Sequence, residues 1–328
     1  MSFFDELRNR ARQDPKLVVL PECDADTEGV IRKAAEIAAA QGTAKPILLT
    51  RQMIQESGKV DEFAEAYAAR RGKSVALGRR LVQDPIPFGV MMVKQGYAHG
   101  MVAGRYAKSG EVMKFANAFI GEEEGRISSG LFFKEAPAGY PVFKLIACAD
   151  MVVNENPDAE QLYRIILTSA ETFRDLTGIE PKIALISYLT GSANQTQINT
   201  PETKKIVDAL ELYKQKNHPW VAFQAQLDAA LSPAVARSKG APFTDGPADL
   251  WIGSNLTVAN PVYKLLRDLV PGGESMFVIQ GLKLPVLDLS RSDSADNVAN
   301  AIAACTVCAR AFEKQGRYGT INTFFVRG

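Results

Sequence analysis

The sequence predicts an α/β fold with two domains, and three observations lead to this prediction. The chain has 328 residues, more than one hydrophobic core commonly organises. Short apolar segments of strand length alternate with amphipathic segments of helical length, which is typical of mainly parallel sheets covered by helices. After residues 121–125 two strand-like segments interrupt this alternation, which indicates a crossover to a second domain.

The first region opens with an amphipathic segment that predicts a helix at the N-terminus. We then expect strands at 16–21, 46–50 and 100–104, and helices at 27–41, 64–71, 88–95 and 111–120. Residues 126–134 and 142–153 are rich in strand-forming side chains, and a turn with Pro137, Gly139 and Pro141 separates them. These two segments therefore predict a hairpin.

Alternation of helices and strands resumes after this hairpin. We expect helices at 159–177, 200–217, 261–269 and 295–315, and strands at 182–188, 248–253 and 277–280. The tail at 319–328 fits either an edge strand or an appendage.

The composition restricts the possible partners. With 38 Lys and Arg against 37 Asp and Glu, the net charge is +1, so a nucleic-acid partner is not expected. An anionic ligand would have to be held by local arginines. No apolar run approaches the ~18 residues of a membrane span, and the N-terminus lacks an apolar signal core. We therefore expect no membrane partner and a cytoplasmic location.

The cysteine and histidine content argues against a disulfide scaffold and a metal site. The four cysteines are Cys23, Cys148, Cys305 and Cys308. They are too few for a disulfide scaffold in a chain of this length, which fits a reducing compartment. Cys305 and Cys308 lie in a helical apolar pattern with no second pair, so we interpret them as core residues. His99 and His218 lie far apart, and we expect no metal.

Residues 284–294 are the most informative stretch of the chain. An apolar, strand-like run ends in Ser290 and Arg291, and a helix-compatible segment follows from residue 295. A hydroxyl and a guanidinium beside the N–H groups of a helix N-terminus suit an anionic, oxygen-rich group such as phosphate. The alternative is that Ser290 only caps the helix and Arg291 is a solvated charge.

Eight short motifs follow one another along the chain. They are Asn156–Glu160, Ser169–Thr172, Glu180–Tyr188, Thr190–Ala193, Gln226–Ala230, Asn260–Lys264, Gln280–Leu282 and Pro285–Arg291. Their order and spacing, together with the opening Val18–Glu22, resemble the phosphate acyltransferase family of phosphate acetyl- and butyryltransferases. The resemblance covers nearly the whole chain.

The resemblance implies a reversible transfer in which acyl-CoA and phosphate give acyl phosphate and CoA. Coenzyme A is then a co-substrate, no cofactor is tightly bound, and the partners are acyl-CoA or CoA and phosphate. It also implies the two-domain architecture of isocitrate and isopropylmalate dehydrogenases, with the active site in the interdomain cleft. Domain I would comprise residues 1–125 and 290–328, and domain II the inserted residues 126–289. Members of the family are commonly homodimers.

The same resemblance suggests roles for individual residues. Ser290 matches a hydrogen-bond donor at the reacting carbonyl, and Arg291 the partner of the phosphate or the oxyanion. Thr190, Gly191 and Ser192 match a Thr-Lys-Gly-Ser-Ala loop, a candidate phosphate cradle that lacks its lysine here. An ordinary turn at the end of a strand is the alternative for this loop.

Three further residues are candidates for substrate binding. Arg70 aligns with an arginine near the CoA entrance, although the adjacent Arg71 leaves the register open by one residue. Lys114 stands where acetyl-type members carry arginine, which keeps the charge but loses the bidentate fork. Asn260 begins the Asn-Pro-Val-Tyr-Lys motif.

Asn297 is the main departure from the acetyl-type pattern, because it stands where those members keep an aspartate proposed as the thiol base. An amide cannot accept that proton. Either Asp293 takes the role, as the butyryl-type Ser-Arg-x-Asp-Ser pattern indicates, or no base is needed because a thiol of pKa ~8.5 is partly ionised at neutral pH. Asp268 stands where acetyl-type members carry another arginine, with Arg267 one residue away. Residues 222–226 depart from a common Asp-Gly-Glu-Leu-Gln run.

We therefore expect a phosphate acyltransferase that transfers a short acyl group, and acetyl is the group that we expect first. Two alternatives stay open: a butyryltransferase-type enzyme with a longer acyl preference, and a catalytically impaired relative that binds CoA or phosphate. A dehydrogenase on the same architecture is disfavoured, because no Gly-x-Gly-x-x-Gly follows a strand and no aspartates cluster for a metal.

Overall fold

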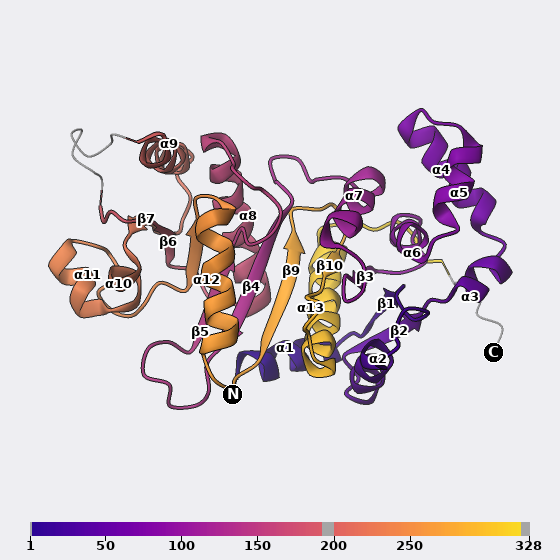
Figure 1. Ribbon diagram of the computed structural model, residues 1–328, viewed down its shortest axis with the longest axis horizontal. Coiled ribbons are helices and arrows are strands. Elements are labelled where there is room, and N and C mark those ends of the chain that lie inside the picture. The colour runs from indigo at the N-terminus through magenta and orange to yellow at the C-terminus, as the bar shows by residue number, and fades with distance from the viewer. Residues whose placement is uncertain (1, 192–199, 323–328) are drawn as a thin grey trace. The chain divides into compact units, whose positions relative to one another are not determined.

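The computed structural model describes residues 2–191 and 200–322 (Figure 1). The chain divides into two compact units. Unit 1 comprises residues 1–123 and 276–328, and unit 2 comprises residues 124–275. Each unit contains its own sheet flanked by helices, so the predicted α/β class is confirmed.

The sheet of unit 1 consists of parallel strands, as the sequence predicts. Its described strands are β1 (Lys16–Leu20), β2 (Ala44–Leu48), β3 (Gly100–Ala103) and β10 (Val286–Asp288), in the order β10-β3-β1-β2. Val18 lies opposite Pro46 on β2 and Gly100 on β3. All of β3 and β10 is buried. Strands covered on both faces read as continuous apolar runs, which is the pattern that predicted them.

Helices lie on both sides of this sheet. They are α1 (Phe3–Arg12), α2 (Val30–Ala40), α3 (Arg51–Glu56), α4 (Val60–Arg71), α5 (Val75–Val82), α6 (Pro85–Lys94), α7 (Ser109–Phe119) and α13 (Ala295–Lys314). Figure 1 shows α2 and α6 on opposite sides of the strands. The long α13 packs against α1, α2 and the strands, and its buried face includes Val298, Ile302 and Cys305.

The sheet of unit 2 contains the predicted hairpin. Its described strands are β4 (Ser129–Glu135), β5 (Leu145–Ala149), β6 (Ile183–Ile186), β7 (Ala222–Ala225) and β8 (Leu250–Gly253). Their order is β7-β6-β8-β5-β4. β4 and β5 pair antiparallel, with Phe132 opposite Cys148, whereas β5, β8, β6 and β7 run parallel. Strand β9 (Ser275–Gln280) then carries the chain back to unit 1.

The helices of unit 2 are α8 (Ala159–Thr177), α9 (Pro201–Gln215), α10 (Leu227–Leu231), α11 (Pro233–Lys239) and α12 (Leu256–Leu269). Asp158 and Gln161 form a capping box at the start of α8, and Gly178 ends the helix with a left-handed φ of 73°. Helix α12 packs on β8, β5 and β4, and Figure 1 shows it on the face turned to the viewer.

Several boundaries differ from the sequence-based expectations. The sequence-based expectation placed the last helix of unit 2 at 261–269, with a proline in its first turn, where proline is common. The structure begins α12 at Leu256, with Asn255 as N-cap, and leaves Pro261 inside the helix. The short elements α3, α5, β7, α10 and α11 were not predicted, because four to eight residues carry too little periodicity. Of the tail, residues 319–322 form neither helix nor strand, and 323–328 lie outside the described residues.

Candidate active site

Polar residues follow three neighbouring strands of unit 1. Glu22 lies just after β1, Arg105 just after β3, and Ser290 just after β10. Because these strands are parallel and adjacent in the order β10-β3-β1, the three residues share the carboxyl edge of one sheet. This edge is where open α/β sheets bind their ligands.

Ser290 opens a tight turn between β10 and α13. Its carbonyl accepts the N–H of Asp293 at 3.0 Å, and its own N–H donates to Asp293 Oδ2 at 2.7 Å. The hydroxyls of Ser290 and Ser292 lie 3.1 Å apart. The N-cap of α13 is Ser294, whose Oγ accepts the N–H of Asn297 at 3.2 Å. Helix capping therefore does not explain Ser290, and the alternative interpretation of this serine is wrong.

Arg291 is exposed on this turn. Its guanidinium makes no hydrogen bond or ion pair with any residue that the structure describes. A guanidinium is always charged and presents donors in a planar fork that matches carboxylate and phosphate oxygens. Arg291 is thus available to an anionic ligand next to the hydroxyls of the turn.

Arg105 supports the same turn from the neighbouring strand. Its Nε donates to the carbonyl of Asp293 at 3.2 Å. Its guanidinium also pairs with Glu28 at 2.8 Å, and its side chain is only 12% exposed. Arg105 is therefore committed to holding the turn, in contrast to Arg291.

Glu22 holds the loop that carries Arg105. Its carboxylate is buried, and its two oxygens accept backbone N–H groups at 2.6–3.0 Å from Gly104, Arg105, Tyr106 and Ala107. Gly104 has a φ of 105°, and a Cβ at this position would collide with Asp288 on β10. The ends of β3 and β10 therefore approach each other closely, with Glu22 organising the loop beyond them.

Asp293, the candidate for the thiol base, and Asn297, at the position where acetyl-type members keep an aspartate, both lie in this region. Asp293 uses Oδ2 to accept the N–H of Ser290, so its carboxylate stabilises the turn. Asn297 is half-buried in the first turn of α13. The side chain of Asn297 is an amide, which has no group that can accept the thiol proton.

Arg70 and Lys114 lie on helices of unit 1. Arg70, near the end of α4, donates from Nε and a terminal nitrogen to the carbonyls of Ala118 at 3.2 Å and Ile120 at 3.0 Å. Its guanidinium thus satisfies carbonyls at the C-terminus of α7, where positive charge is favourable. Lys114 is exposed on α7, with Nζ 5.6 Å from the ring centre of Phe115.

The candidate phosphate cradle of unit 2 lies after β6 and next to the end of β7. Gly191 donates its N–H to the carbonyl of Gln224 at 3.0 Å and has a φ of 89°, a conformation that favours glycine. Thr190 Oγ1 accepts the N–H of Gln226 at 3.1 Å and donates to Gln226 Oε1 at 3.3 Å. Ser192, the third residue of this prediction, lies outside the described residues.

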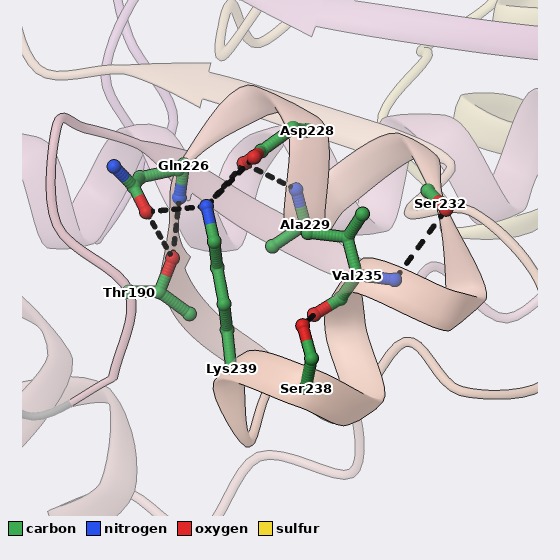
Figure 2. A network of polar contacts seen from close by, with 8 residues as sticks. All are labelled: Thr190, Gln226, Asp228, Ala229, Ser232, Val235, Ser238 and Lys239. Carbon is green, nitrogen blue, oxygen red and sulfur yellow. Dashed lines mark hydrogen bonds and ion pairs between the residues drawn. The ribbon is translucent and has the colours of Figure 1, made fainter.

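A lysine from another helix reaches this loop (Figure 2). Lys239, the last residue of α11, places Nζ 2.7 Å from Gln226 Oε1 and pairs with both carboxylate oxygens of Asp228, at 2.9 and 2.7 Å. Through Gln226, which also bonds Thr190 Oγ1, this lysine is linked to the loop whose sequence lacks a lysine, and the sequence alone did not predict this contact.

Asn260, on α12, is a structural link in unit 2. Its Nδ2 donates to the carbonyl of Met151 at 2.9 Å. Met151 belongs to a loop after β5 that the buried Asp150 holds through the N–H groups of Val152, Val153 and Asn154. At the end of α12, Asp268 pairs with Arg267 at 2.7 Å, so that arginine is engaged by its neighbour.

Four residues that organise these loops were not predicted from the sequence. They are Glu22, Arg105, Gln226 and Lys239. The first and third lie inside motifs quoted above, and a polar side chain directly after an apolar strand was the available signal. Arg105 follows a strand in the same way. The position of Lys239 depends on tertiary contacts, which no local pattern of the sequence shows.

The remaining candidate chemistries receive no support among the described residues. No three His, Cys, Asp or Glu side chains gather there at metal-binding distance. Cys305 is buried on α13, its pKa is raised by burial, and no disulfide joins it to Cys308. In the same part of the chain, no helix combines the length and apolar character required to cross a bilayer.

Comparison with known proteins gives consistent matches. A family model described as "Phosphate acetyl/butaryl transferase" matches residues 2–306. The phosphate acetyltransferase of Acetivibrio thermocellus is 31% identical over 335 aligned positions, covering 94% of this chain and 99% of that protein. The phosphate acetyltransferase of Thermoanaerobacterium thermosaccharolyticum is 32% identical over 338 positions, covering 94% and 100%.

A solved structure agrees with these sequence matches. The crystal structure of a phosphotransacetylase from Streptococcus pyogenes superimposes with a TM-score of 0.80 at 27% identity, covering 94% of this chain and 98% of that one. The resemblance inferred from the motifs is thus confirmed. Because the family model spans most of the sequence and the relatives match along their whole lengths, the chain belongs to the phosphate acetyl/butaryl transferase family.

Proposed function

We propose that this protein transfers an acetyl group reversibly between coenzyme A and inorganic phosphate. Membership of the family supports this class of reaction, and the relatives described above are named phosphate acetyltransferases. The observation that carries the proposal is the turn at Ser290. It presents hydroxyls beside an arginine that has no partner among the described residues, at the carboxyl edge of a parallel sheet.

The reaction requires two kinds of charge stabilisation. A phosphate oxygen attacks the carbonyl carbon of acetyl-CoA, and a tetrahedral intermediate with an oxyanion forms. The C–S bond then breaks, the sulfur leaves with the electron pair, and the thiolate takes up a proton from solvent. Ser290 donates a hydrogen bond to the carbonyl oxygen as its charge grows, and Arg291 neutralises the phosphate or the oxyanion.

The geometry favours a mechanism without a dedicated thiol base. Asp293 uses an oxygen to accept the N–H of Ser290 at 2.7 Å, which supports a role in shaping the turn. Asn297 offers an amide, which cannot accept the proton. A thiol of pKa ~8.5 is ionised to a few per cent at neutral pH, so CoA can react as its thiolate in the reverse direction.

The remaining candidates are proposed to bind the substrates. Thr190, Gly191 and Ser192 are proposed as a phosphate cradle, in which the Thr190 hydroxyl and the Gly191 N–H would exchange their present bonds to Gln226 Oε1 and the Gln224 carbonyl for bonds to phosphate. Lys114 offers an exposed cation. Arg70 donates to the carbonyls of Ala118 and Ile120, so we propose that it mainly stabilises the C-terminal end of α7. Asn260 likewise supports the loop at Met151.

The cellular setting is also a proposal. We infer a cytoplasmic enzyme, because buried thiols such as Cys23 and Cys148 without disulfides suit a reducing compartment. We also infer a homodimer, as the family resemblance implies. Light scattering of the purified protein tests the second inference, and a monomer mass at micromolar concentration would refute it.

A coupled assay tests the proposed function. We expect acetyl phosphate to be consumed with formation of acetyl-CoA only when CoA, acetyl phosphate and the protein are all present. A set of acetyl, propionyl and butyryl phosphates then measures the acyl preference, and we expect the largest kcat/KM with acetyl. A higher value with butyryl would support the longer-chain alternative. Binding of CoA without turnover would identify a catalytically impaired relative.

A further inference from the structure

Gln226 is held in one orientation by the network in Figure 2. Its Oε1 receives Lys239 Nζ at 2.7 Å and Thr190 Oγ1 at 3.3 Å. An amide of glutamine can present either its oxygen or its nitrogen to a neighbour, so the neighbours decide which end points where. A lysine ammonium can only donate, so the oxygen must face Lys239.

The other end of the amide is consequently fixed as a donor. In Figure 2 the side-chain nitrogen of Gln226 points away from Lys239 and Thr190. This nitrogen makes no hydrogen bond with any residue that the structure describes. Gln226 is half-buried and directly follows β7, while Thr190 follows the neighbouring parallel strand β6. The unused donor therefore lies at the carboxyl edge of the sheet of unit 2, beside the candidate phosphate loop.

Lys239 is itself held in place. Asp228 binds its Nζ through both oxygens, and Asp228 Oδ1 also accepts the N–H of Ala229 at 2.8 Å. The hydrogen bond from Lys239 lowers the pKa of Asp228, which favours the charged form of this carboxylate. Lys239 ends α11, and Gly240 with a φ of 68° turns the chain away behind it. The ammonium is thus held by three acceptor oxygens from two residues, Gln226 and Asp228.

We propose that Lys239 is a positioning residue that fixes Gln226 as a hydrogen-bond donor to a phosphate group of the substrates. The inference rests on the proposed function, since it assigns the phosphate chemistry of that reaction to Gln226. The phosphate group belongs either to inorganic phosphate or to coenzyme A. Without the ammonium, the amide of Gln226 can rotate, and its donor is no longer preorganised.

Steady-state kinetics of Lys239→Met test the proposal. We expect the KM for phosphate or the KM for acetyl-CoA to rise about tenfold, the scale of one hydrogen bond to a charged group, while kcat changes less. The substrate whose KM rises is the source of the phosphate group. Lys239→Arg keeps a permanent donor and should restore most of the lost affinity. Lys182→Met is the matched control, because Lys182 pairs with Asp245 in the same unit with a similar exposure of 34% against 31%.

A double-mutant cycle separates positioning from direct binding. In the background of Gln226→Leu, Lys239→Met should have no further effect, because the residue through which it acts is gone. Equal effects of Lys239→Met in both backgrounds would overturn the proposal. So would unchanged KM values for both substrates, or the same loss in Lys182→Met.

Calorimetric titration with phosphate alone and with CoA alone measures ligand binding without turnover. The role of Lys239 can therefore be tested separately from the proposed activity. If the wild-type protein shows no catalysis yet binds one of these ligands about tenfold more tightly than Lys239→Met does, the proposed function fails and the inference stands. If the wild-type protein is active and Lys239→Met binds both ligands equally well, the function stands and the inference fails.

Discussion

At the residue scale, two arginines beside the same turn have opposite environments. Arg105 is largely buried and donates to the carbonyl of Asp293, whereas Arg291 is exposed and has no partner among the described residues. Little free energy is needed to turn a charged side chain toward a ligand when only water solvates it. More free energy is needed when the side chain must first break its bonds to two acceptors. This contrast supports the proposal that Arg291 contacts the substrate, whereas Arg105 supports the loop.

Removing either group of the Ser290–Arg291 pair should impair the chemical step. We expect Ser290→Ala and Arg291→Ala each to lower kcat at least ~10²-fold, the scale of losing one oxyanion donor. The melting temperature should stay close to that of the wild-type protein. Arg80→Ala, which removes an exposed arginine from α5, is the control and should keep full activity. Near-normal turnover in either site variant would discredit this site.

Asn297→Asp tests the role of the position where acetyl-type members carry aspartate. Residue 297 is the third residue of α13, and Ser294 is the N-cap, so an acidic side chain here completes a capping box. We expect a gain of ~0.3–1 kcal/mol in the free energy of unfolding, measured with urea. Activity should be retained or increased. A severe loss of turnover in a stably folded variant would show that this position does not face the thiol.

At the scale of elements, buried carboxylates hold the loops that follow the strands. Glu22 does this after β1 for the loop at Gly104, and Asp150 does it after β5 for the loop at Met151. A buried carboxylate is costly unless hydrogen bonds compensate it, and backbone N–H groups of an irregular loop need acceptors. Each carboxylate therefore accepts hydrogen bonds from backbone N–H groups of a loop that lacks the regular hydrogen bonds of a helix or a strand.

Glu22→Gln should loosen the loop that carries Arg105. The amide nitrogen cannot accept, so the N–H groups that now donate to one of the carboxylate oxygens lose their acceptor. At ~1–3 kcal/mol for each buried unsatisfied group, we expect a loss of at least ~2 kcal/mol in unfolding free energy. We also expect faster amide hydrogen exchange at residues 104–107 and a lower kcat. Wild-type exchange rates in this loop would contradict the role of Glu22.

His99 gives unit 1 a dependence on pH. Burial and the nearby charge of Lys16 lower the pKa of His99, and its Nδ1 accepts the N–H of Leu17 at 3.3 Å. Because the folded pKa lies below the unfolded value of ~6.5, the unfolded chain binds more protons, and stability falls as the pH drops below that value. Unfolding in urea at pH 7.5 and 5.5 should show this loss, and His99→Gln should reduce it. An identical loss in both proteins would rule out His99 as its source.

Long elements of this fold could be predicted from the sequence, and short ones could not. Helix α8 has a capping box and a C-terminal glycine, and its bounds match the prediction at 159–177. Helices α10 and α11 have five and seven residues, too short for a hydrophobic period to show. This matters for the proposed site, because α11 carries Lys239, which contacts Gln226 only through the tertiary fold.

At the scale of the whole molecule, the chain consists of two α/β units, and each has a loop cluster at the carboxyl edge of its parallel strands. In unit 1 the cluster contains Ser290 and Arg291. In unit 2 it contains Thr190, Gly191 and Gln226. The Ser290 cluster could be located from sequence, because a Ser-Arg pair after an apolar run is a local signal. The supporting contacts of Arg105 and Lys239 could not, because they join residues far apart in the chain.

We propose that this protein exchanges an acetyl group between CoA and phosphate at the Ser290–Arg291 turn. The most direct test is the rate of acetyl-CoA formation from acetyl phosphate and CoA with the purified wild-type protein and with Arg291→Ala. We predict turnover with the wild-type protein and a loss of at least ~10²-fold in the variant. A rate in the wild-type protein no higher than in buffer would refute the proposed activity, and an equal rate in the variant would refute the role of Arg291.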